Sequence, residues 1–162
     1  MLSLTKRVDY GLIALADLCG FSDPVSARDL AERHHVSLPL LANVLKDLCA
    51  FGLVSSSRGK RGGYRLLADP AFVTVEQVIE ALEGPFQLAA CTGADHAAGC
   101  EISSNCTIKW SVNKIHGAVQ KILGTVTISD IVSQARVGLN EALVDKTAGD
   151  VAFHEVPLNL EV

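Results

Sequence analysis

A short glycine-rich turn constrains the fold of this chain more than any other stretch. Residues 57–63 read S-R-G-K-R-G-G and lie between two segments, 53–56 and 64–67, that have the length and composition of β-strands. Glycines let the backbone reverse tightly, and the turn is basic as well as flexible. The pattern therefore predicts a small antiparallel hairpin with a positively charged tip.

Three helical segments precede this hairpin. The spacing of apolar residues predicts a helix over residues 4–19 with Thr5 as its cap, and Ser26 has the position of a cap for a second short helix. A third helix is expected after Ser37 and up to Gly52. Two short helices joined by a brief turn and followed by a hairpin are typical of a winged helix-turn-helix, a mainly α fold with a small β wing. An unrelated three-helix core is the alternative for the helices alone.

Positive charge is concentrated around the hairpin, although the whole chain has a net charge of −4. Residues 1–75 contain nine Lys or Arg against seven Asp or Glu, whereas residues 76–162 contain five against eleven. A local basic patch matters more for nucleic acid than the total charge. We therefore expect double-stranded DNA as the partner, contacted by the third helix and the hairpin through Ser37, Pro39, Asn43, Lys46, Arg58, Lys60 and Arg61. A nucleotide-binding loop is the alternative, but the G-K-[ST] ending of a P-loop is missing.

Three of the five cysteines, Cys91, Cys100 and Cys106, fall within residues 90–110, which have no hydrophobic periodicity. An odd number of cysteines and a charged N-terminus favour a cytoplasmic protein with metal or redox chemistry over a disulfide framework. Thiolates select zinc or iron–sulfur clusters, and reduced thiols are the alternative. The S-S-N triplet before Cys106 is expected to cap a helix, so that Cys106 would lie at a helix N-terminus.

A helix is expected on each side of this cysteine segment. Thr74 and Gln77 have the pattern of a capping box, and that helix should stop at Gly84. Beyond the cysteines, apolar residues recur at alternating steps of four and three, at Ile108, Val112, Ile115, Val119 and Ile122. Such a stripe exceeds what the small N-terminal domain needs and predicts a homodimer through paired helices. A helix lying on its own winged domain is the alternative.

The expected organisation has four parts. Residues 1–84 form a winged helix-turn-helix DNA-binding domain, and residues 85–106 form a cysteine-rich cluster-binding loop. Residues 107–135 form a dimerisation helix and a short following helix, and residues 136–162 are a C-terminal tail without clear periodicity. Since no nucleophile elbow, paired carboxylate motif or phosphate loop is visible, we expect no enzymatic activity.

Four motifs together resemble the Rrf2 family of bacterial transcriptional regulators. They are L-T-K-R-V-D-Y-G near the N-terminus, G-L-V-S-S-S-R-G-K-R-G-G-Y-R-L in the hairpin, V-I-E-A-L-E-G-P after it, and the three-cysteine segment. The stretch E-A-L-E-G-P-F-Q-L-A-A-C is similar to the branch that regulates SUF-type iron–sulfur assembly operons. The resemblance implies a dimeric repressor that binds a palindromic operator. It also implies sensing of iron–sulfur status, redox or nitric oxide through an iron–sulfur cluster, with two or four irons left open.

The resemblance also implies a set of cluster ligands. The three cysteines match those of the family, although the first two lie further apart than in IscR-like members. IscR-like members have a histidine shortly after the third cysteine, where this chain has Lys109. Asp9 matches the N-terminal carboxylate that NsrR-like members supply from the partner subunit, and His34, His35 and His96 are alternative ligands. A thiol- or zinc-based redox switch on the same fold is the alternative to a cluster.

Overall fold

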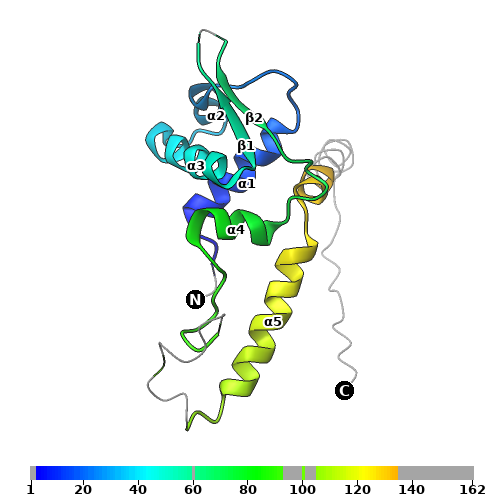
Figure 1. Ribbon diagram of the computed structural model, residues 1–162. Helices are drawn as coiled ribbons and strands as arrows, with labels where there is room; N and C mark the ends of the chain where they lie inside the picture. The colour runs from blue at the N-terminus through cyan, green and yellow to red at the C-terminus, as the bar shows by residue number, and fades with distance from the viewer. Residues whose placement is uncertain (1–2, 60, 93–99, 101–104, 135–162) are drawn as a thin grey trace, which may run out of the picture. The chain divides into compact units, whose positions relative to one another are not determined.

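The computed structural model describes residues 3–59, 61–92, 100 and 105–134 (Figure 1). The chain divides into two units, Met1–Val132 and Ser133–Val162, and all the elements named here belong to the first. In chain order they are α1 (Lys6–Leu18), α2 (Ala27–Arg33), α3 (Leu38–Phe51), β1 (Val54–Ser57), β2 (Gly63–Leu66), α4 (Val75–Glu83) and α5 (Lys109–Thr125). This order confirms the predicted fold class, mainly helical with one two-stranded antiparallel sheet.

The hydrophobic core lies between α1, α3 and α4 because each of these helices buries one apolar stripe. The buried side chains include Val8, Leu15 and Leu18 of α1, Leu41, Val44, Leu45 and Leu48 of α3, and Val75, Val78, Ile79 and Leu82 of α4. A Cβ at Gly11 would lie 2.6 Å from Leu82 Cδ1, so α1 and α4 approach closely because this residue has no side chain. Helical spacing in the sequence therefore identifies most of the core.

Side-chain caps explain where three of the helices begin. Thr5 and Ser26 each accept a hydrogen bond from the backbone N–H three residues ahead, at 3.3 and 3.1 Å. Thr74 and Gln77 form a complete capping box, with bonds of 3.2 and 3.0 Å in opposite directions. Ser37 is the N-cap residue of α3, as its place before the expected third helix indicated, but its side chain makes no cap hydrogen bond.

The hairpin is anchored to the segment that precedes α2. β1 and β2 pair in a register that places Val54 opposite Leu66. β1 begins one residue later and β2 one residue earlier than predicted. Val25 forms an isolated bridge with Tyr64, through backbone hydrogen bonds of 2.9 and 2.8 Å. A Cβ at Gly63 would lie 2.5 Å from the Val25 carbonyl, so only glycine permits this contact. The hairpin extends beyond α2 and α3 at the top of Figure 1.

After α5 the chain returns to the beginning of α4. Thr74 and Thr127 form an isolated antiparallel bridge, and the backbone N–H groups of Val75 and Ile128 donate across it at 2.9 Å each. The Asp130 carboxylate accepts hydrogen bonds from the backbone N–H and the hydroxyl of Thr127, at 2.9 and 2.7 Å, and these bonds lower the pKa of Asp130. Residues 128–132 are helical, which confirms the short helix expected there.

Candidate DNA interface and cysteine segment

α3 presents a polar face outward while its opposite face is held in the core. Pro39, Asn43 and Lys46 are exposed, and their spacing of four and three residues gives them one common side of the helix. Ser37, directly before the helix, is exposed as well. All four side chains are therefore available to a partner that lies along α3, as the bases and phosphates of a major groove do for a recognition helix.

The hairpin carries cations at its tip. Arg58 and Arg61 are exposed, whereas Lys60 lies outside the described residues. A Cβ at Gly62 would lie 2.4 Å from the backbone oxygen of Ser57, so the turn closes tightly only because this residue is glycine. Guanidinium groups beside a narrow, open backbone turn suit contacts with phosphate groups.

Reasoning from the sequence missed one further cation of the hairpin, Arg65 in β2. Its side chain is exposed, whereas those of its neighbours Tyr64 and Leu66 are half-buried. Ser55 Oγ donates to the Arg65 backbone oxygen at 3.4 Å, across the hairpin. Because successive strand residues point to opposite faces, the apolar neighbours were the signal that Arg65 faces away from the core. The positive charge of the tip thus continues down the strand.

The two histidines before α3 have different surroundings. His34 Nε2 lies 3.1 Å from Asp17 Oδ2, and the same oxygen accepts a hydrogen bond of 2.7 Å from Arg33. The Arg33 guanidinium also lies 4.6 Å from the ring centre of Phe21. His35 is exposed and adopts a φ of 52°, in the turn between α2 and α3. The contacts of His34 tie the end of α2 to α1 and give it a structural role within the helix-turn-helix.

All three cysteines of the predicted cluster segment are described, and so is Asp9, whereas His96 is not. Cys91 is buried, Cys100 and Cys106 are half-buried, and Asp9 is exposed near the start of α1. Among the described residues, no three or more His, Cys, Asp or Glu side chains are grouped as metal ligands. Three thiolates have the donor chemistry of an iron–sulfur or zinc site, but a single chain does not assemble such a site from its described residues.

A hydrogen-bonded turn fixes the chain just before and around Cys91. Thr92 Oγ1 accepts hydrogen bonds from the backbone N–H groups of Leu88 and Ala89, at 3.1 Å each, and donates to Ala89 O at 2.8 Å. The Thr92 side chain is buried together with Cys91. These hydrogen bonds therefore hold the backbone around Cys91, the first cysteine of the segment.

Cys106 precedes α5 and is not at its N-terminus. α5 begins at Lys109, its N-cap is Ile108, and no side-chain cap hydrogen bond is made there. The prediction that a polar triplet caps a helix at Cys106 is therefore wrong, because the helix starts three residues later. Trp110, the single tryptophan, follows Cys106 by four residues and is exposed, with Lys114 Nζ 5.2 Å from its ring centre. It offers an optical reporter close to the cysteine.

α5 contacts the segment that precedes the cysteines, but much of its apolar surface is exposed to solvent. It buries one polar side chain, His116, whose ring stacks on that of Phe86 at 5.3 Å between centres and 4° between planes. Within the described part of the chain, His116 Nδ1 has no hydrogen-bond partner. Three isoleucines spaced by seven residues remain exposed by 61, 52 and 61%: Ile108, Ile115 and Ile122.

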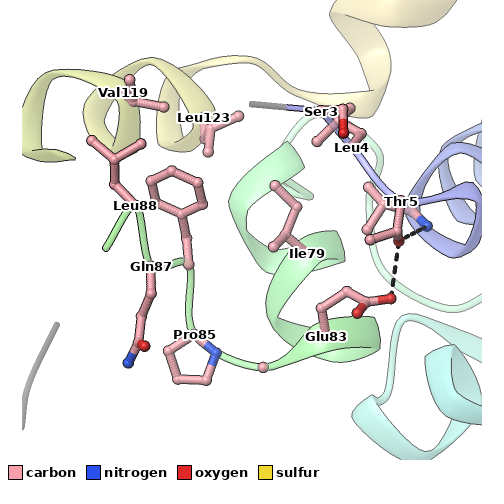
Figure 2. Close-up of a pocket in the computed structure, with 13 residues that line it drawn as sticks. Ser3, Leu4, Thr5, Ile79, Glu83, Pro85, Gln87, Leu88, Val119 and Leu123 are labelled. Atoms are coloured by element: carbon pink, nitrogen blue, oxygen red, sulfur yellow. Dashed lines mark hydrogen bonds between the residues drawn. The ribbon is translucent and has the colours of Figure 1, made fainter. Parts of the chain in front are cut away.

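A cleft of about 540 Å³ lies between the beginning of α1, the end of α4 and α5. Figure 2 shows Leu88, in the chain that leads to the cysteines, facing Val119 and Leu123 of α5. At the other end of the cleft, Thr5 Oγ1 donates a hydrogen bond of 3.0 Å to Glu83 Oε1. The first turn of α1 and the last turn of α4 are thus joined where the cysteine segment begins.

Comparison with known proteins identifies one family. The model of the Rrf2 family, described as an iron-dependent transcriptional regulator, matches residues 4–134. The HTH-type transcriptional regulator NsrR of Bacillus licheniformis is 30% identical, over 81% of this chain and 92% of that protein. The HTH-type transcriptional regulator IscR of Xenorhabdus nematophila is 29% identical, over 83% of this chain and 81% of that protein.

Solved structures give the same result. CymR, the global cysteine regulator of B. subtilis, has a TM-score of 0.65 and 28% identity, covering 83% of this chain and 98% of that one. T. potens IscR has a TM-score of 0.64 and 28% identity, covering 83% of this chain and 88% of that one.

In the described part of the chain, no helix is both long and apolar enough to span a membrane.

Proposed function

Because the chain belongs to the Rrf2 family of transcriptional regulators, we propose that it is a DNA-binding repressor controlled by the chemical state of Cys91, Cys100 and Cys106. The observation that carries the proposal is the exposed polar face of α3 beside a hairpin with arginines at its tip. A winged helix-turn-helix uses these two surfaces for base contacts and for phosphate contacts. The repressor acts in the cytoplasm on genes of iron–sulfur assembly or stress response.

In this proposal the two surfaces have different tasks on the DNA. Asn43 reads a base edge in the major groove, because its amide both donates and accepts hydrogen bonds. Lys46, Arg58, Lys60 and Arg61 neutralise phosphates, and Ser37 and Pro39 form the end of α3 that approaches the groove first. Each neutralised phosphate adds about −0.9 to the slope of log affinity against log salt concentration. Charge therefore sets the strength of binding, and Asn43 contributes to its selectivity.

The proposed repressor is a homodimer through α5. The exposed isoleucines at steps of seven residues form one stripe along the helix, as a seam between two helices requires. Burying this stripe against a second copy removes apolar surface from water, which favours association. A two-fold dimer presents two copies of α3 to a palindromic operator, with half-sites about one helical turn of DNA apart.

An iron–sulfur cluster is the group that we propose for the three cysteines. Thiolates are its ordinary ligands, and this donor set fits it. When bound, the cluster supplies a centre whose charge and ligation change with oxidation or nitric oxide. Thr92 holds the chain around Cys91 in place, and Asp9 of the second copy provides the fourth ligand.

A thiol- or zinc-based switch is the second candidate, and one observation favours it. The similar structures include the global cysteine regulator CymR alongside IscR, so the fold alone accompanies more than one kind of sensing. A zinc or thiol switch predicts a colourless protein whose DNA affinity responds to oxidants.

Anaerobic purification tests both candidates. The visible absorption spectrum, iron content and sulfide content are measured for the wild type, Cys100→Ala and Asp9→Ala, with Cys49→Ala as the control. Cys49 is half-buried against the core on α3 and lies outside the cysteine segment, so its loss should leave the cluster in place. We expect a brown wild type and control, and bleached Cys100→Ala and Asp9→Ala proteins. A colourless, iron-free wild type after reconstitution would replace the cluster with the zinc or thiol switch.

A further inference from the structure

Arg7 lies between two carboxylates from different helices. Its Nη2 donates a hydrogen bond of 2.7 Å to Asp47 Oδ2 in α3. Its Nε lies 3.4 Å from Glu83 Oε1, the last residue of α4, as an ion pair without hydrogen-bond alignment. Glu83 Oε1 also accepts the hydrogen bond from Thr5, which is drawn in Figure 2. One guanidinium in α1 therefore touches both α3 and α4.

The two carboxylates belong to the parts of the molecule that a regulator must connect. Asp47 follows Lys46 on α3, the helix that we assign to the DNA major groove. Glu83 ends α4, and Gly84, with a φ of 86°, directs the chain from there toward Cys91. Besides the direct packing of α4 on α3 in the core, Arg7 therefore gives a movement at the root of the cysteine segment a polar connection to α3.

We propose that Arg7 is the positioning residue that couples the root of the cysteine segment, residues 84–92, to the recognition helix α3. This inference rests on the proposed function, since it assumes that α3 binds DNA and that the cysteine segment has two states. Arginine suits this role because its planar guanidinium holds two carboxylates at once, in fixed directions, whereas a lysine ammonium on a flexible stem acts as a point charge. Arg7 couples α4 to α3 only while it contacts Glu83 and Asp47 at the same time.

The expected effect is modest because the bridge is partly exposed. The Arg7 side chain is 41% exposed, as is that of Asp47, and ion pairs at such sites are weakened by solvent. Loss of the bridge should therefore reduce the coupling between cysteine state and DNA affinity by about threefold, within the range measured for exposed pairs.

The test compares Arg7→Gln, Glu83→Gln and Asp47→Asn with the matched control Arg33→Gln. Arg33 also makes a 2.7 Å ion pair and its side chain is also 41% exposed, but this ion pair joins α2 to α1. The probe is a DNA duplex that the wild-type protein selects from a random-sequence pool. The ratio of the dissociation constants of the cluster-loaded and cluster-free full-length proteins measures the coupling.

A second readout needs no cluster. Coupling is reciprocal, so DNA bound to α3 should change hydrogen exchange at the amides of Leu88 and Ala89, which donate to Thr92 Oγ1. Exchange is compared with and without the duplex in the cluster-free protein. In the wild type and Arg33→Gln we expect DNA to alter these two amides, and in Arg7→Gln and Glu83→Gln we expect that response to shrink.

The outcomes separate this inference from the proposed function. We expect the affinity ratio to fall about threefold in all three bridge variants, with no further fall in the double variant of Arg7 and Glu83. A wild-type ratio well above one that Arg7→Gln retains, together with an unchanged exchange response, would overturn the role of Arg7 alone. A wild-type ratio of one would overturn control by the cysteines, and the inference with it.

Discussion

Replacing Gly63 with alanine tests whether the contact with Val25 holds the hairpin in place. A Cβ at residue 63 would lie 2.5 Å from both the carbonyl carbon and the carbonyl oxygen of Val25. Carbon atoms in ordinary contact are about 3.5–4.0 Å apart, so the two segments must separate by roughly 1 Å. The backbone hydrogen bonds between Val25 and Tyr64, now 2.9 and 2.8 Å, would then exceed the length of a good bond.

The loss of both hydrogen bonds sets the expected decrease in the free energy of unfolding. At about 0.5–1.5 kcal/mol each, they predict a decrease of about 1–3 kcal/mol in the free energy of unfolding. Urea denaturation followed by circular dichroism measures it, provided that the slope of the transition is unchanged. Gly20→Ala is the control, because its Cβ would meet only one backbone oxygen at 3.3 Å and its φ is not left-handed. Equal stability of Gly63→Ala and Gly20→Ala would refute the reasoning.

The same variant separates the position of the wing from its charge. Gly63→Ala removes no cation, so Arg58 and Arg61 remain available. If the hairpin must be held against Val25 to reach DNA, affinity for the selected duplex should fall in Gly63→Ala and not in Gly20→Ala. Gel-shift titrations of the folded proteins without urea provide that comparison.

Three further predictions concern the two surfaces and the short final helix. Arg58→Ala should reduce the slope of log affinity against log salt by about 1, whereas Asn43→Ala should change the ranking of duplex variants with little change in that slope; both are measured by fluorescence anisotropy. Ile115→Lys should convert a dimer into a folded monomer in sedimentation velocity, since it introduces a charge into the exposed stripe of α5; a dimer that persists would contradict the seam. Asp130→Asn should lower the melting temperature at pH 7, because the backbone and side-chain hydrogen bonds from Thr127 hold the folded-state pKa of Asp130 below its ordinary value. This stabilisation is present above the unfolded pKa and is lost as pH falls through the folded pKa, so the difference from wild type should vanish in acid.

Local signals in the sequence were reliable where one short stretch determines the geometry. Thr5, Ser26 and Thr74 cap helices because the hydroxyl needs only the backbone N–H three residues ahead. Ser37 has the same position before α3 without the hydrogen bond, and Pro39 follows it within the first turn. A residue type allows a cap, whereas the orientation of the side chain depends on what surrounds it.

Contacts between distant residues were beyond the reach of such signals. Arg7 meets Asp47 across 40 positions, and Thr5 meets Glu83 across 78, so no periodicity relates them. The same holds for the stack of Phe86 on His116, which joins the chain before the cysteines to α5. The cysteine pattern predicted which sulfur atoms are available as ligands, but the spacing in the sequence does not determine where those side chains lie relative to one another.

The bridge between Thr74 and Thr127 closes residues 75–126, which include α4, the cysteine segment and α5, into one loop of the chain. Two 2.9 Å hydrogen bonds hold the backbone at the start of α4 beside the backbone that follows α5. Lengthening a flexible loop of this kind costs little free energy, since each doubling of its length adds only about 0.6 kcal/mol of closure entropy. The cysteine segment can therefore change in length and composition while α1, α2, α3 and the hairpin keep their structure, which makes this chain a suitable frame for inserting other segments at the same place.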